Sequence, residues 1–241
     1  MGGPSGAGRT GFAGGDVERG ARWDRITAIA GLLFVVLVVA SFFTPDVPDS
    51  GDSAEELAAA ISNDRAGHQM SLLLGFLSDI AFLVFLAGVF SRLRRYEGLG
   101  GMFSSLLAIA GAAFSATIVV SEGLYLAYIQ AAENADPSVL PTIARLDDWV
   151  GIGTVPVAVA MMIGAAGAIL STHALPVWLG WLAGLNAVLL LLSLGAVFES
   201  DDESVLVSIG GFGGFLLFII WTLAASVVLL MRPRHHVEAA A

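Results

Sequence analysis

The 241-residue chain contains neither cysteine nor lysine, and each absence excludes a class of chemistry. Without cysteine there can be no disulfide, thiolate metal site, iron–sulfur cluster or cysteine nucleophile. Without lysine there can be no Schiff base to retinal or to a pyridoxal cofactor, because both need a primary amine. Charged residues are scarce as well, at 13%, whereas hydrophobic residues make up 56% and the mean hydropathy is +0.83. This is the composition of a chain that lies mostly in lipid.

Long apolar blocks take up most of the chain. A helix needs about 20 apolar residues to cross a bilayer, and six blocks meet or nearly meet this length. They are Ile26 to Phe43, Gln69 to Ser91, Met102 to Leu126, Val150 to Leu170, Pro176 to Phe198 and Val205 to Met231. The polar stretches between them are too short to form a hydrophobic core of their own. The sequence therefore predicts an all-α fold, a polytopic integral membrane bundle of six transmembrane helices.

The arginines predict the orientation of this bundle. If all six blocks cross the membrane, nine of the eleven arginines lie on one side with both termini, and only Arg65 and Arg145 lie on the other. Cytoplasmic loops retain arginine, so we expect N-in/C-in topology in the bacterial inner (plasma) membrane, as a multi-pass protein. We expect a disordered cytoplasmic N-terminus over residues 1–25, one membrane domain over 26–231 and a cytoplasmic tail over 232–241.

The opposite side of the membrane is predicted to be strongly acidic. Its loops carry fourteen acids and two arginines, a formal net charge of −14 + 2 = −12. A face of this charge can concentrate cations or repel anions. Charge runs of this kind are more often solvated surface, which is the interpretation that we favour.

Two polar segments contain signals for short helices. Ser53-Ala54-Glu55-Glu56 is a capping box, in which the serine and the last glutamate each accept a hydrogen bond from the other's backbone. It predicts a surface helix from about Ala54 to Ser62. Asp136-Pro137-Ser138 predicts a turn that leads into a second short amphipathic piece before Trp149, which stands where an aromatic-belt residue is expected.

Pairs of small residues at i, i+4 spacing predict close helix contacts, because small side chains let helix backbones approach in lipid. These contacts can lie within one chain or between copies, and packing within one chain is the simpler explanation. Pro156, one turn into the fourth block, is expected to bend that helix. The pairs are Ala160 and Gly164, Gly180 and Gly184, and Gly210 and Gly214.

Two carboxylic acids within the apolar blocks, Asp79 and Glu122, are the sharpest signal in the sequence. A carboxylate at mid-membrane costs roughly 2.5 to 3.5 kcal/mol, so such residues usually face a cavity or a partner. Asp79 is eleven residues beyond His68, about 16 Å below the outer surface at 1.5 Å per residue. A small and polar stripe leads to it on one helical face: His68, Ser71 and Gly75, with Ser78 beside it.

The third and fifth blocks carry polar residues that point to the same region. Glu122 and Tyr125 share a face of the third block with Gly111 and Ser115, and Asn186 is near the middle of the fifth. One interpretation is an outward-opening polar cavity in which Asp79, Glu122 and Asn186 bind a proton or a cation, the two acids sharing one proton. The alternative is a structural pair of neutral acids, hydrogen-bonded to serine and asparagine, that fixes the order of the helices.

Other chemistries are discounted from positions along the chain. His68 and His173 fall at opposite membrane faces, so they cannot share a haem iron, and His235 and His236 are more simply a solvated pair than a metal site. No hydrolase triad, zinc-protease motif or phosphate-binding loop is present. We therefore expect no enzymatic activity, no cofactor, no bound metal and no nucleic-acid partner. The expected partners are membrane lipid, a proton or cation, and another protein or a second copy of the chain at small-residue helix faces.

Three short segments resemble a known family. They are Arg25 to Gly31, Gly75 to Ile80 and Pro176 to Gly180. Together they are similar to a family of bacterial polytopic membrane proteins classed as a domain of unknown function, with an F-x-S-D motif in the second span. The resemblance implies a bundle of about six helices with no assigned activity, and it marks Ser78 and Asp79 as a family feature. Glu122 matches no motif of that family.

Two function classes remain open from the sequence. The first is a non-enzymatic membrane component with a polar outer-half cavity around Asp79 and Glu122. The second is a small proton- or cation-coupled transporter or permease. Secondary transporters often contain related halves, and the blocks here share no convincing repeat, which favours the first class.

Overall fold

The computed structural model describes residues 10–45, 47–48, 51–134, 137–197 and 205–231, and within these ranges all regular structure is helical. Six helices are long and a seventh, α2, is short. Two single turns of 3-10 helix follow α4 and α6, at Pro137–Val139 and Leu194–Val197. The α-helices are α1 Thr10–Ser41, α2 Ala54–Asn63, α3 Arg65–Glu97, α4 Met102–Asn134, α5 Leu140–Thr172, α6 Val177–Ser193 and α7 Val205–Met231.

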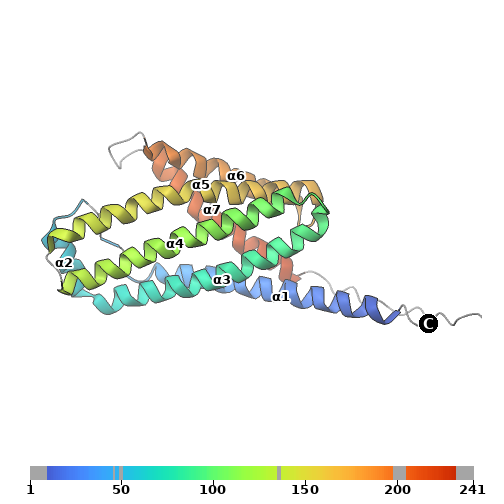
Figure 1. Ribbon diagram of the computed structural model, residues 1–241, viewed down its shortest axis with the longest axis horizontal. Helices are drawn as coiled ribbons and strands as arrows, with labels where there is room; N and C mark the ends of the chain where they lie inside the picture. Colours follow the sequence, from blue (N-terminus) through green and yellow to red (C-terminus); the bar gives the residue numbers. More distant parts are fainter. Residues whose placement is uncertain (1–9, 46, 49–50, 135–136, 198–204, 232–241) are drawn as a thin grey trace, which may run out of the picture.

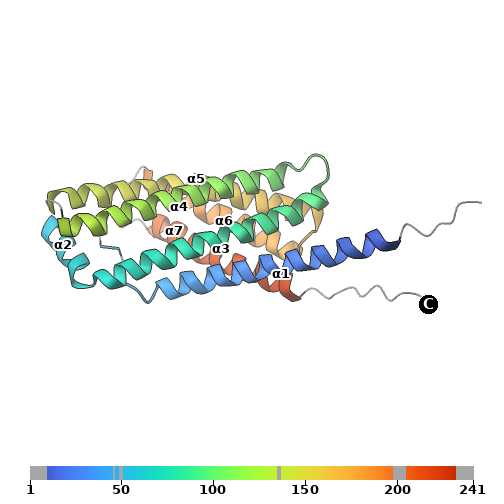
Figure 2. The same ribbon diagram turned by 60° about the horizontal axis from the view of Figure 1, so that its bottom comes forward.

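The six long helices form a closed ring of neighbours. Each packs against the next in the order α1, α3, α4, α5, α6, α7, and α7 packs against α1 to close the ring. The bundle is elongated, with the start of α1 and the end of α7 at one end and α2 lying across the other end (Figure 1). The view after rotation shows the same arrangement (Figure 2). We call these the terminal end and the α2 end.

Five helical segments are long and apolar enough to cross a membrane: 22–41, 65–97, 102–133, 137–172 and 209–231. This property makes the chain a multi-pass membrane protein. The fifth predicted block is shorter than expected, since α6 has 17 residues and spans about 26 Å at 1.5 Å per residue. In contrast, α3, α4 and α5 have 33 residues each, about 50 Å. These three helices therefore extend beyond a hydrocarbon layer of about 30 Å.

Two hydrophobic cores follow from these unequal lengths. The larger core fills the centre of the ring, where Phe34, Phe82, Phe114 and Phe218 pack with neighbouring ring centroids 5.3 to 5.9 Å apart. The smaller core lies at the α2 end between α2, α3, α4 and the start of α5. It contains Leu57, Ile61, Leu72, Tyr125, Tyr128, Ile129, Leu140 and Ala144.

At the terminal end, Arg92 joins three parts of the chain. Its guanidinium forms an ion pair with Asp24 of α1, and its Nε donates a hydrogen bond to the carbonyl of Ala174, which follows α5, at 3.3 Å. The same group lies over the ring of Tyr96, 5.8 Å from the centroid. This arginine therefore fixes α1 and the α5–α6 connection against α3.

The expected capping box is confirmed. The Ser53 backbone N–H donates to the Glu56 carboxylate at 2.9 Å, and the Glu56 N–H donates to Ser53 Oγ at 3.3 Å. The helix that follows, α2, buries Leu57 and Ile61 and so presents one apolar face to the bundle. The prediction of a short amphipathic surface helix therefore holds to within one residue at its end.

Two helices, α1 and α5, begin at least ten residues earlier than the sequence predicts. α1 begins at Thr10, within the stretch expected to be disordered up to residue 25; residues 1–9 and the tail 232–241 lie outside the described residues. The separate amphipathic piece expected before Trp149 is absent from the described residues, because α5 runs unbroken from Leu140 through Pro156 to Thr172. Extending an existing helix adds one hydrogen bond per ordered residue, whereas starting a new helix is costly. Both polar stretches therefore continue the neighbouring apolar helix.

The small-residue pairs pack within the chain, as expected. A Cβ added at Gly164 would lie 2.5 Å from the backbone nitrogen of Leu107 on α4, and one added at Gly210 would lie 2.6 Å from that of Ser193 on α6. Gly180 lies against Leu170 of α5 in the same way. These glycines allow close approach of neighbouring helices in the ring.

Candidate functional site

The structure brings Asp79 and Glu122 together between α3 and α4. Their carboxyl groups approach each other closely enough to interact directly. An ionised carboxylate only accepts hydrogen bonds, so two carboxyl groups can bond directly only if one of them carries a proton. The arrangement therefore suits a pair of acids that holds one proton. Asp79 is 8% exposed and Glu122 is half-buried.

Gly75 provides the space for this pair. It stands one turn before Asp79 on α3, and a Cβ at this position would collide with Glu122 Oε1. Ser78 lies beside the pair, but its hydroxyl donates to the Gly75 carbonyl at 2.8 Å and so serves its own helix. Within the small and polar stripe predicted on α3, Gly75 thus leaves the space that the Glu122 side chain occupies, and we call this space the Gly75 cradle.

A second polar link joins the same two helices toward the α2 end. His68 Nδ1 and the Tyr125 hydroxyl are 2.6 Å apart, and both side chains are buried. The two rings meet edge to face with centroids 6.1 Å apart. His68 and Tyr125 belong to the predicted site, and they lie beside the small core at the α2 end. The α3–α4 interface therefore has two polar links: the acid pair, and the contact between His68 and Tyr125 nearer the α2 end.

Buried oxygen atoms remain around the acid pair. Asp79 Oδ2 and Glu122 Oε2 have no hydrogen-bond partner among the described residues. The same holds for Ser115 Oγ, whose side chain is 3% exposed. Ser115 is two turns from Glu122 on a face that also contains Gly111, which lies against Leu86 of α3. The interface between α3 and α4 thus offers three unused acceptor atoms.

Asn186 does not join this site, contrary to the sequence prediction. With its amide nitrogen toward α7, Asn186 donates to the Gly214 carbonyl at 2.8 Å and accepts from the Phe218 N–H at 3.2 Å. The side chain is completely buried between α6 and α7. Its role is therefore to satisfy the backbone of α7. Ser193, at the end of α6, donates to its own helix at the Leu190 carbonyl.

Asp147 is a half-buried acid that the sequence prediction counted among the acids outside the membrane. It lies in α5, half-buried, and its carboxylate accepts a hydrogen bond from the hydroxyl of Ser121, the residue before Glu122. A signal for this position exists in the sequence: Leu140, Ala144 and Asp147 follow the i, i+4, i+7 spacing of one helical face. Leu140 and Ala144 are buried in the smaller core at the α2 end.

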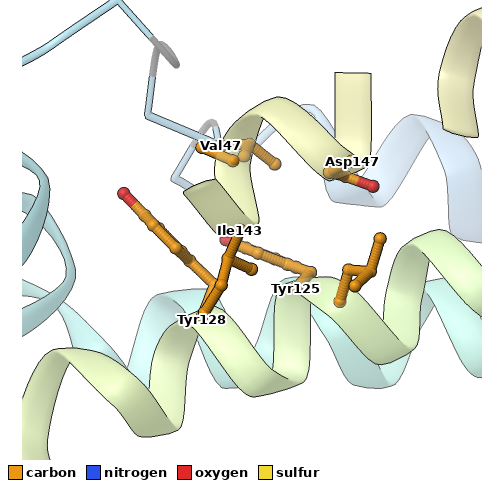
Figure 3. A pocket seen from close by; sticks show the side chains of 7 residues that line it. Val47, Tyr125, Tyr128, Ile143 and Asp147 are labelled. Carbon is orange, nitrogen blue, oxygen red and sulfur yellow. The ribbon is translucent and has the colours of Figure 1, made fainter. Parts of the chain in front are cut away.

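A small cavity lies beside Asp147 (Figure 3). Its volume open to the centre of a water molecule is about 10 Å³. Figure 3 shows Tyr125 and Tyr128 of α4 on one side and Ile143 and Asp147 of α5 on the other. This volume is near the lower limit for one water molecule.

The four phenylalanine rings of the larger core close the other side of the acid pair. Phe82 is one turn beyond Asp79 toward the terminal end, and Phe114 is two turns from Glu122 in the same direction. Their ring centroids are 5.8 Å apart. The pair therefore lies where a polar interface toward the α2 end meets an apolar one toward the terminal end.

Within the described residues, no group of three or more histidine, aspartate and glutamate side chains is arranged to hold a metal ion. No family model, curated protein or solved structure matches this chain.

Proposed function

We propose that this protein is a non-enzymatic component of the bacterial cell membrane that binds one proton between Asp79 and Glu122. The observation that carries the proposal is the close approach of the two carboxyl groups, with Glu122 Oε1 against Gly75 one turn before Asp79. Gain or loss of the shared proton changes what holds α3 to α4: with the proton the acids attract, and without it two negative charges face each other in a region of low dielectric constant. The protein thereby responds to the proton activity on one side of the membrane.

Six spans with both termini in the cytoplasm are the topology that we propose. α5 ends and α7 ends at the terminal end of the bundle, so α6 has to return the chain to the α2 end (Figure 1). The 3-10 turn Leu194–Val197 extends α6 in that direction. In this topology the α2 end faces away from the cytoplasm, and the predicted resemblance to the F-x-S-D family implies the same kind of bundle.

The exposed side chains of α3 support a position of the acid pair deep in the membrane. Apolar side chains are exposed on one face from Met70 to Ala87, and the next exposed position is Ser91. The 22 residues from 70 to 91 span about 30 Å, the thickness of a hydrocarbon core. Asp79, nine residues beyond Met70, is then about 14 Å deep and faces away from lipid.

A small proton- or cation-coupled transporter is the second candidate. The observation in its favour is that Asp79 Oδ2, Glu122 Oε2 and Ser115 Oγ are buried and unpartnered, which offers oxygen ligands to a cation. Transport also needs a second route from the site to the terminal end of the bundle, and the packed aromatic rings of the larger core fill the space where this route would run. This contact favours a proton-binding component over a transporter.

The proposal is tested by infrared spectroscopy of the protein in lipid. A protonated carboxyl has a C=O stretching band that an ionised carboxylate lacks. We expect such a band at neutral pH in the natural protein, and we expect Asp79→Asn and Glu122→Gln each to remove it while the fold is kept. Absence of the band in the natural protein would contradict the shared proton.

Vesicles distinguish the two candidates. With the protein reconstituted and a pH-sensitive dye inside, we expect no protein-dependent proton flux, with or without a sodium or potassium gradient. A flux that Asp79→Asn abolishes would establish the transporter instead.

A further inference from the structure

We propose that Asp147 is the group through which the proton shared by Asp79 and Glu122 exchanges with water at the α2 end. The inference rests on the proposed function and adds a proton entrance to it. It assigns a role to an acid on a third helix, α5, that has no contact with the pair itself.

The first observation is the position of Asp147 between water and the pair. Its neighbour Asp148 is exposed, and Trp149 is 67% exposed, so this turn of α5 lies at the edge of the bundle. Asp147 itself is turned inward, where Ser121 donates a hydrogen bond to it. Ser121 precedes Glu122 directly in α4. Asp147 is thus the half-buried acid that connects the surface of α5 with the segment of α4 that carries the pair.

The second observation is incomplete packing at the same place. The cavity of about 10 Å³ lies between α4 and α5 beside Asp147, and its lining includes Tyr125 and Tyr128 (Figure 3). Tyr128 is 2% exposed, yet its hydroxyl has no hydrogen-bond partner among the described residues. A buried hydroxyl of this kind is usually satisfied by a water molecule. The cavity and the hydroxyl together provide space and a hydrogen-bond partner for one water molecule beside Asp147.

The third observation is that the opposite direction is closed. Phe34, Phe82, Phe114 and Phe218 contact one another on the terminal side of the pair. These rings have no group that can carry a proton. Proton exchange through the α2 side is therefore the shorter and more polar route.

Proton transfer along this route is balanced. A proton from water binds the Asp147 carboxylate and moves on through hydroxyl groups and water, each of which accepts one proton as it gives up another. The pair changes from two carboxylates to one carboxylate and one carboxylic acid, and the reverse sequence releases the proton. The other ionisable groups that act on this region include His68, bonded to Tyr125, Asp52, whose charge acts on Tyr128, and Asp148, whose charge acts on Asp147.

The experiment follows hydrogen–deuterium exchange of the carboxyl band that Asp79→Asn removes. After rapid transfer into D₂O, the time constant of the band shift reports how fast the pair exchanges its proton. Asp147→Asn keeps an oxygen that accepts the Ser121 hydrogen bond but cannot carry a proton at neutral pH. We expect it to slow the exchange by at least about tenfold, since a positioned proton-transfer group contributes 10² to 10⁴-fold, while the size of the band stays the same.

Asp148→Asn is the matched control, because it removes the neighbouring exposed acid, whose charge acts on Asp147 but which does not lie on the proposed route, and it should change the time constant far less than Asp147→Asn does. Ser121→Ala should also slow the exchange, as Asp147→Asn does. An unchanged time constant in Asp147→Asn, or equal slowing by Asp148→Asn, would overturn the entrance while the shared proton stands. Absence of the band from the natural protein would contradict both proposals together.

Discussion

Gly75 determines how closely the two acids can approach. Replacement by alanine would place a Cβ against Glu122 Oε1. The end of a glutamate side chain can move aside, so the main loss is the hydrogen bond to Asp79, and an unmade buried hydrogen bond costs about 1 to 3 kcal/mol. We expect Gly75→Ala to lower the free energy of unfolding by about this amount and to remove the protonated carboxyl band. Thermal unfolding in detergent and infrared spectra check the two effects.

Gly123→Ala is the control for this substitution. Gly123 is on α4 next to Glu122, and a Cβ there would meet no atom within 4 Å. Alanine favours helix over glycine by roughly 0.5 to 1 kcal/mol, so this variant should be as stable as the natural protein or more so, with its band intact. A lost band in Gly123→Ala, or an unchanged one in Gly75→Ala, would argue against the Gly75 cradle.

At the scale of single residues, helical periodicity was informative within a helix and less so between helices. It predicted that Asp79 and Gly75, and likewise Glu122 and Tyr125, share a face, and the structure brings those faces together. Periodicity does not show which neighbouring helix a face contacts. The prediction that Asn186 lies near the acid pair was therefore wrong, because its side chain bonds to α7. Asp147 was missed because it was counted with the solvated acids outside the membrane, although α5 turns it toward Ser121 of α4.

The element that depends most on local sequence is α2, and its stability should depend on pH. The backbone N–H of Ser53 donates to the Glu56 carboxylate, and this bond, with the Ser53 hydroxyl, holds the pKa of Glu56 below its usual value. A lowered pKa means that the contribution is complete above the pKa of the unfolded chain and is lost as the pH falls through the pKa of the folded chain. Protection of the α2 amides from hydrogen exchange should therefore decrease between about pH 6 and pH 3.

Glu56→Gln separates this effect from others. Glutamine also completes a capping box but does not titrate, so the protection factors of α2 should no longer change with pH. Hydrogen exchange followed by mass spectrometry provides the measurement. The same decrease in Glu56→Gln would assign the pH dependence to another group.

Whole helices were predicted more reliably than their ends. The apolar blocks locate all six long helices, because only an apolar segment with internally bonded backbone is stable in lipid. Helix ends outside the hydrocarbon layer carry no such constraint, and here α1 and α5 continue into polar sequence. The reverse occurs at α6, where the apolar block is longer than the helix.

The orientation of the whole molecule can be tested with single introduced cysteines, because the chain contains no natural cysteine that would have to be removed first. Ser62→Cys places a thiol at the α2 end and Tyr96→Cys places one near the terminal end, both at exposed positions. With nine of eleven arginines predicted on the terminal side, an impermeant maleimide added to intact cells should label Ser62→Cys only. Permeabilised cells, in which both should react, are the control. Labelling of Tyr96→Cys alone in intact cells would reverse the orientation.

The closed ring of helices has a consequence for how the protein is made. α1 packs against α3 and also against α7, where Gly31 lies against Ser226. The ribosome completes α1 first and α7 last, so one face of the first helix remains against lipid until the final segment has been inserted. Up to that moment the ring of helices is incomplete, and Phe34 and Phe82 lack their contacts with Phe218. A chain shortened before Val205 would enter the membrane and yet never close, and quality-control proteases should remove it faster than the complete protein.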